Sequence, residues 1–176
     1  MTTLEERARS IRLVCTDIDG VLTTGALSYG DGESHGKSFH VRDGAAIKWL
    51  QRFGIPVAFI SGLDSPATWA RAKHLGIEDC FAGRLDKRPI LDELCLKYGL
   101  GPEQVAHLGD DLPDLPLLRR VGLACCPRDA VAEIQQACHW IIPVEGGRGV
   151  LRSLAEFILK NQGHWDSVVA TYQDGS

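Results

Sequence analysis

The sequence of 176 residues predicts an α/β protein built on an open parallel sheet with helices on both faces. Two observations predict this fold class. Short apolar runs typical of buried strands recur along the chain, and segments with helical spacing separate them. The apolar runs are 11–15, 56–60, 104–108, 122–126 and, more weakly, 140–142. We therefore expect a Rossmann-like sheet in a single domain of residues 1–176.

The first expected strand is followed by a segment that interrupts the alternation of strands and helices. Between Thr23 and Val41 the sequence has no helical period, but a short alternating run lies on each side of GDGESHG. This pattern predicts a β-hairpin with a loose loop, inserted at about residues 24–40.

The later helices are predicted by apolar positions that share one face and by residues that mark helix ends. The shared faces are Ile47, Leu50 and Phe53, then Ile90, Leu91, Leu94 and Tyr98, and finally Leu151, Leu154 and Ile158. Gly54, Gly76 and Gly99 each follow a helical pattern, as helix-ending glycines do. Ser65 before Pro66 is typical of an N-cap with proline at the first helical position.

The composition excludes several classes of function. A net charge of −4 provides no broad basic surface for nucleic acid or for an anionic membrane, and no stretch approaches the ~20 apolar residues of a membrane span. The six cysteines lack the paired spacing of metal fingers, so we expect reduced thiols and a cytoplasmic protein.

Polar side chains follow the expected strands where the carboxyl ends of a parallel sheet meet, which is where such sheets bind ligands. They are Asp17 and Asp19, Ser61 and Gly62, Lys87, and Asp110, Asp111 and Asp114. Five carboxylates at one edge repel one another unless a cation lies among them, and hard oxygen ligands select magnesium or calcium. For a phosphate substrate Mg²⁺ is the better choice.

The stretch DIDG at residues 17–20 suggests the chemistry. Residues i and i+2 of a strand point the same way, so Asp17 and Asp19 can approach one reacting centre while Gly20 lets the chain turn away. With a phosphate ester, Asp17 would attack phosphorus to form an aspartyl-phosphate, and Asp19 would act as acid and then base. Ser61, Lys87, Mg²⁺ and backbone N–H groups would neutralise the developing charge.

Four motifs in this order, DIDG, SG, Lys87 and GDDLPD, resemble the haloacid dehalogenase superfamily. FHVRDGAAI, LGI, DK and GGRG extend the resemblance over about residues 11–162, to a capless subfamily of sugar-acid phosphatases. The resemblance implies Asp17 as nucleophile and Mg²⁺ ligand, Asp19 as acid/base and ligand through its backbone carbonyl, and Asp110 as the third ligand. It also implies a homotetramer in which the hairpins help to cover adjacent sites.

The resemblance further implies a set of residues that line the substrate site. They are His40, Val41, Arg42, Asp43, Gly44, Lys48, Arg71 and Lys87. The chain departs from the subfamily at two places: Leu63 stands where arginine is usual, and His40 where asparagine is common. We hold Arg148 of the GGRG stretch as a weaker candidate for a substrate contact.

Simpler roles and other functions remain open. We expect Asp111 and Asp114 to support the site, one capping the next helix and the other orienting Lys87, and His107 to be structural. A nonulosonate 9-phosphate phosphatase and a phosphatase-like oligomerisation module are the alternatives. A phosphomutase or ATPase would need a cap domain to exclude water. The chain has no room for one, because only about forty residues separate Asp19 from Ser61 and about twenty-five separate Ser61 from Lys87.

Overall fold

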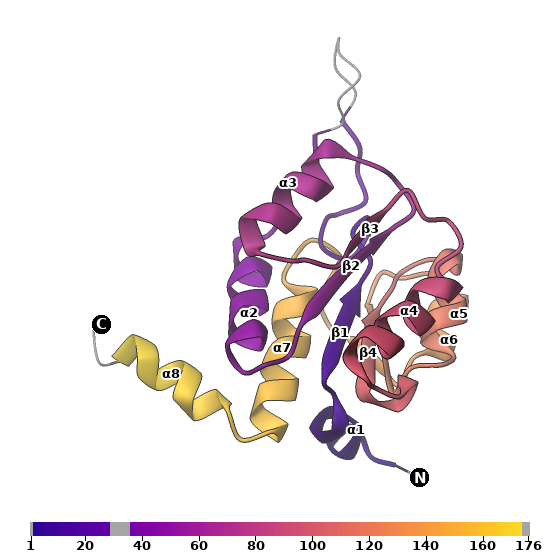
Figure 1. Cartoon of the computed structure of the whole chain (residues 1–176). Coiled ribbons are helices and arrows are strands. Elements are labelled where there is room, and N and C mark those ends of the chain that lie inside the picture. The colour runs from indigo at the N-terminus through magenta and orange to yellow at the C-terminus, as the bar shows by residue number, and fades with distance from the viewer. Residues whose placement is uncertain (1, 29–35, 174–176) are drawn as a thin grey trace.

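The computed structural model describes residues 2–28 and 36–173, and within them six parallel strands form one open sheet (Figure 1). The strand order is β3-β2-β1-β4-β5-β6. The strands are β1 Leu13–Thr16, β2 Val57–Ser61, β3 Cys80–Ala82, β4 Val105–Leu108, β5 Leu123–Pro127 and β6 Trp140–Ile142. Because the chain turns to opposite sides after β1 and after β4, the switch point lies between these two central strands.

Helices cover both faces of the sheet, as the sequence predicted (Figure 1). They are α1 Leu4–Ser10, α2 Val41–Arg52, α3 Pro66–Leu75, α4 Arg88–Tyr98, α5 Leu115–Leu118, α6 Ala132–Ala137, α7 Val150–Asn161 and α8 Trp165–Gln173, with 3₁₀ turns η1 Pro102–Gln104 and η2 Leu112–Asp114. One core lies under α1, α2, α3 and α7 and the other under α4, α5 and α6. Val14 of β1 packs in the first core and its neighbours Leu13 and Cys15 in the second, which is the alternation of a strand.

The predicted helix ends are largely confirmed. Gly76 and Gly99 end α3 and α4 in the left-handed conformation, each with φ +64°. Pro66 occupies the start of α3, but the Ser65 hydroxyl makes no capping hydrogen bond. The backbone carbonyl of Ser65 accepts from Thr68 N instead, at 3.0 Å.

Four helices and strands were not expected: α1, α6, α8 and β3. β3 is a half-buried edge strand of three residues, so its apolar run is too short to predict a strand. α1 does carry a local signal, because Thr3 and Glu6 form a capping box in which each side chain accepts from the other's backbone N–H.

The predicted hairpin lies partly outside the described residues. Ser28 and Gly36 form one antiparallel bridge, and of the expected loop at residues 30–36 only Gly36 lies within the described residues. Between Asp19 and the start of β2 the other described element is α2, which agrees with a capless domain. All six cysteines are free thiols. In residues 2–28 and 36–173 no helix is long and apolar enough to cross a membrane.

Candidate active site

The carboxyl end of β1 delivers Asp17 and Asp19 to the middle of the sheet edge. Asp17 N donates to Leu108 O at 2.8 Å, which ties the first residue after β1 to the end of β4. Gly20 has φ +89°, and a Cβ there would overlap the Asp110 carboxylate. Glycine is therefore required both for the turn after Asp19 and for the approach of Asp110.

A buried ammonium connects the two central strands. Lys87 Nζ, on a side chain that is 2% exposed, lies 2.7 Å from Asp17 Oδ1 and 2.8 Å from Asp114 Oδ1. His107 Nε2 lies 2.8 Å from the same oxygen of Asp114, and Asp110 N donates to Asp114 Oδ2 at 3.3 Å. The expected division of roles is confirmed, since Asp114 pairs with Lys87 and Asp111 caps η2 by accepting from Leu112 N.

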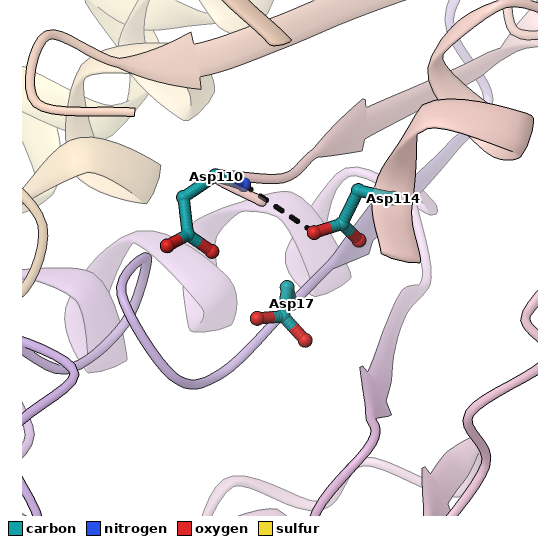
Figure 2. A group of neighbouring side chains, drawn as sticks. All are labelled: Asp17, Asp110 and Asp114. Atoms are coloured by element: carbon teal, nitrogen blue, oxygen red, sulfur yellow. Dashed lines mark hydrogen bonds between the residues drawn. The ribbon is translucent and has the colours of Figure 1, made fainter. Parts of the chain in front are cut away.

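Three of these carboxylates face a common space (Figure 2). Oxygens of Asp17, Asp110 and Asp114 lie within 4.8 Å of one another. Burial and the charge of Asp114 raise the pKa of Asp17 to about 7, and burial and the charges of Asp17 and Asp114 raise the pKa of Asp110 to about 8. Burial opposes ionisation of Asp114, but its hydrogen bond with His107 and the charge of Lys87 hold its pKa below the usual value.

The arrangement fits a hard divalent cation. Burial and then the repulsion between carboxylates raise the pKa values of Asp17 and Asp110, and a positive charge between them would favour their ionised forms. Asp110 Oδ1 is buried and, among the described residues, has no hydrogen-bond partner, so it is available as a ligand. Both carboxylate oxygens of Asp114 already have partners, namely Lys87, His107 and Asp110 N. Asp114 is therefore a weaker candidate for a metal ligand than Asp17 or Asp110, as expected from the sequence.

Asp19 has two partners, one of which the sequence did not indicate. Ser61 Oγ lies 3.3 Å from Asp19 Oδ2 and accepts from Leu63 N at 3.2 Å. Lys37 Nζ lies 2.8 Å from the same Asp19 oxygen. Lys37 is 18 residues away in an irregular segment, so no local spacing could have connected it with Asp19.

These side chains line a cavity of about 600 Å³ at the edge of the sheet. Its lining includes Asp17, Asp19, Lys87, Asp110 and Leu63. A space of this size accommodates a phosphorylated metabolite. The structure therefore brings together the predicted nucleophile, acid/base, cation and ligand carboxylates, with Leu63 beside them.

The other predicted substrate residues form a separate cluster where α2 meets α3 and α7. None of them, Lys87 apart, belongs to the lining of this cavity. Arg71 donates to His40 O at 3.3 Å across Gly44, whose missing Cβ makes room for the guanidinium. Val41 is 79% exposed.

Two members of that cluster have structural partners. Lys48 Nζ donates to Leu75 O, at the end of α3, at 2.6 Å. Asp43 Oδ1 accepts from Arg152 N at 2.8 Å in the first turn of α7, whose own cap residue, Gly149, has no side chain. Their substrate contacts stay predictions.

The GGRG stretch braces the turn that follows Asp19. Gly147 N donates to Val21 O at 2.9 Å, and a Cβ on Gly146 would overlap the carbonyl of Gly20. Arg148 is exposed. The glycines therefore have a packing role.

Comparisons with known proteins agree on one family. Residues 36–122 match the model of the haloacid dehalogenase-like hydrolases. The chain is 39% identical over 160 residues to a 3-deoxy-D-manno-octulosonate 8-phosphate phosphatase of Haemophilus influenzae, covering 91% of this chain and 89% of that protein.

Solved structures give the same result. A probable YrbI family phosphatase of Pseudomonas syringae matches with a TM-score of 0.95 and 43% identity, covering 98% of each chain. The 3-deoxy-D-manno-octulosonate 8-phosphate phosphatase of Moraxella catarrhalis, in complex with a magnesium ion, a phosphate ion and a KDO molecule, matches with a TM-score of 0.93 and 34% identity. That match covers 96% of this chain and 97% of the other.

Proposed function

Because this chain belongs to the haloacid dehalogenase-like hydrolases, and within them to the 3-deoxy-D-manno-octulosonate 8-phosphate phosphatases, we propose that it hydrolyses 3-deoxy-D-manno-octulosonate 8-phosphate. This reaction would serve the synthesis of lipopolysaccharide precursors. The observation that carries the proposal is the intact set of Asp17, Asp19, Lys87 and Asp110 around one cavity. An inert oligomerisation module would have no need of it.

Asp17 is the nucleophile in the proposed mechanism. Its carboxylate attacks phosphorus, the bond from phosphorus to the sugar oxygen breaks, and an aspartyl-phosphate forms. Lys87, 2.7 Å from Asp17 Oδ1, offsets the negative charge on that carboxylate and on the entering phosphoryl group.

Asp19 handles both protons in the proposed mechanism. It donates one to the departing sugar oxygen, then accepts one from the water that attacks the aspartyl-phosphate. The products are the sugar acid and inorganic phosphate, with Asp17 regenerated. Asp17, Asp110 and the Asp19 carbonyl are the proposed Mg²⁺ ligands, and the ion would supply further neutralisation of phosphate charge when bound. The Mg²⁺ in the Moraxella catarrhalis relative supports this choice of cation.

The test is phosphate release from a panel of sugar-acid and neutral sugar phosphates. Asp17→Asn should abolish turnover with the fold intact, Asp19→Asn should be severely impaired, and chelation should silence the wild type until Mg²⁺ is restored. Substantial turnover by Asp17→Asn or by metal-free enzyme would sink the mechanism. Preference for a neutral hexose phosphate would refute the sugar-acid assignment alone.

We also propose that the chain acts as one domain, in the cytoplasm, and as a homotetramer. The cavity has no cap over it among the described elements, and an isolated hairpin is marginal in water. If the hairpins of neighbouring subunits pack together over adjacent sites, the hairpins would be stabilised and the cavities would be covered.

A further inference from the structure

We propose that Lys37 is a positioning residue that fixes the Asp19 carboxylate for proton transfer to the leaving group. This inference rests on the proposed function and deepens it. Lys37 lies in the segment between Gly36, which bridges Ser28, and the start of α2. It therefore reaches Asp19 from an element outside the sheet.

The two oxygens of Asp19 have different surroundings. Oδ1 is buried and has no hydrogen-bond partner in the described part of the chain. Oδ2 accepts from Lys37 Nζ at 2.8 Å and lies 3.3 Å from Ser61 Oγ. Asp19 lines the cavity and its side chain is 27% exposed, so Oδ2 is the oxygen that can meet a bound ester. Lys37 holds that oxygen.

Lys37 is itself held in place. Its side chain is 1% exposed, and Nζ also donates to Thr68 Oγ1, on α3, at 3.2 Å. Thr68 is fully buried. An ammonium enclosed in this way cannot contact the substrate directly, so any effect on the reaction passes through Asp19.

Removal of Lys37 should therefore imitate a loss of acid catalysis. Lys37→Met keeps the length and packing of the side chain but removes the hydrogen bond to Asp19. The carboxylate would then be free to leave the orientation that proton transfer needs, and acid catalysis is worth ~10²–10⁴-fold. The loss should depend on the leaving group. A sugar alkoxide needs a proton as it departs, whereas p-nitrophenolate leaves without one.

The experiment compares kcat/KM of the wild type, Lys37→Met and Lys73→Met for the octulosonate 8-phosphate and for p-nitrophenyl phosphate. We expect Lys37→Met to lose about 100-fold on the sugar ester and less than about tenfold on the aryl ester. Lys73, an exposed lysine of α3, is the matched control and should change neither. Equal losses on both esters, or no loss, would overturn the role of Lys37.

A double-mutant cycle gives an independent readout. If Lys37 acts through Asp19, Lys37→Met should cost less than about threefold further in an Asp19→Asn background. Losses that multiply would contradict the inference. If Lys37→Met fails to fold, Thr68→Val is the alternative variant, because it removes only the hydroxyl that anchors Lys37 Nζ. It should shift the ratio of the kcat/KM values for the two esters in the same direction as Lys37→Met, but by less.

The outcomes separate this inference from the proposed function. A wild type that hydrolyses neither ester would refute the phosphatase proposal itself. A wild type that hydrolyses both, with Lys37→Met impaired equally on each, would refute only the positioning role.

Discussion

Asp114→Ala should cause a large loss of stability, because Asp114 balances the buried charge of Lys87. The Asp114 side chain is 2% exposed and accepts from Lys87 and His107 on Oδ1 and from Asp110 N on Oδ2. Alanine would leave Lys87 with Asp17 as its remaining carboxylate. It would also leave the Asp110 N–H and His107 Nε2 without their acceptor.

The expected size follows from that burial. Removal of one partner of a buried ion pair costs about 3–5 kcal/mol, and for a domain of this length each kcal/mol lowers Tm by about 2–4 °C. Asp114→Ala should therefore lower Tm by about 6–20 °C. Asp114→Asn keeps an acceptor on the same scaffold, so it should cost less, about 1–3 kcal/mol.

The assay is thermal and urea unfolding in the presence of a chelator, so that metal bound to the native state does not alter the comparison. Asp92→Ala is the matched control, because it removes a carboxylate from an exposed ion pair with Arg120 and should change Tm by no more than about 4 °C. If Asp114→Ala has the same Tm as Asp92→Ala, Asp114 does not stabilise the fold by balancing the buried charge of Lys87. Turnover should also fall in Asp114→Ala, since Lys87 loses one of the two groups that orient it.

Three further predictions concern specificity, pH and assembly. Leu63→Arg restores the cation usual in the subfamily at a position on the cavity wall. Discrimination between octulosonate 8-phosphate and other sugar-acid phosphates, measured as the ratio of kcat/KM values, should therefore rise by about one to two powers of ten. An unchanged ratio would contradict this prediction. Burial raises the pKa of Asp43 from 3.8 to about 6, so between those pH values the native state binds more protons than the unfolded state and the wild type loses stability as pH rises. Asp43→Asn should therefore gain up to about 3 kcal/mol relative to the wild type between pH 4 and 6 in urea unfolding, whereas a pH-independent difference would rule this account out. Light scattering at micromolar concentration should show an oligomer, and a fully active monomer would count against subunits that cover one another's sites.

Local sequence determined most of the scaffold and the centre of the candidate site. Apolar runs located five of the six strands, and helical spacing located α2, α4 and α7, because burial on one or both faces leaves a period in the sequence. Asp17 and Asp19 could be placed together because successive side chains of an extended segment alternate in direction. β3 was not predicted because an edge strand of three half-buried residues is too short to show such a period.

Only the tertiary structure decided which distant side chains meet. The sequence left open which of Asp111 and Asp114 pairs with Lys87, and it gave no sign that Lys37 reaches Asp19 or that Asp43 serves α7 rather than the cavity wall. Spacing along a strand or helix sets the direction of a side chain, but its partner depends on how the helices pack around the sheet. Lys37 and Asp19 are 18 residues apart, so no helical or strand period relates them, and only this packing brings them into contact.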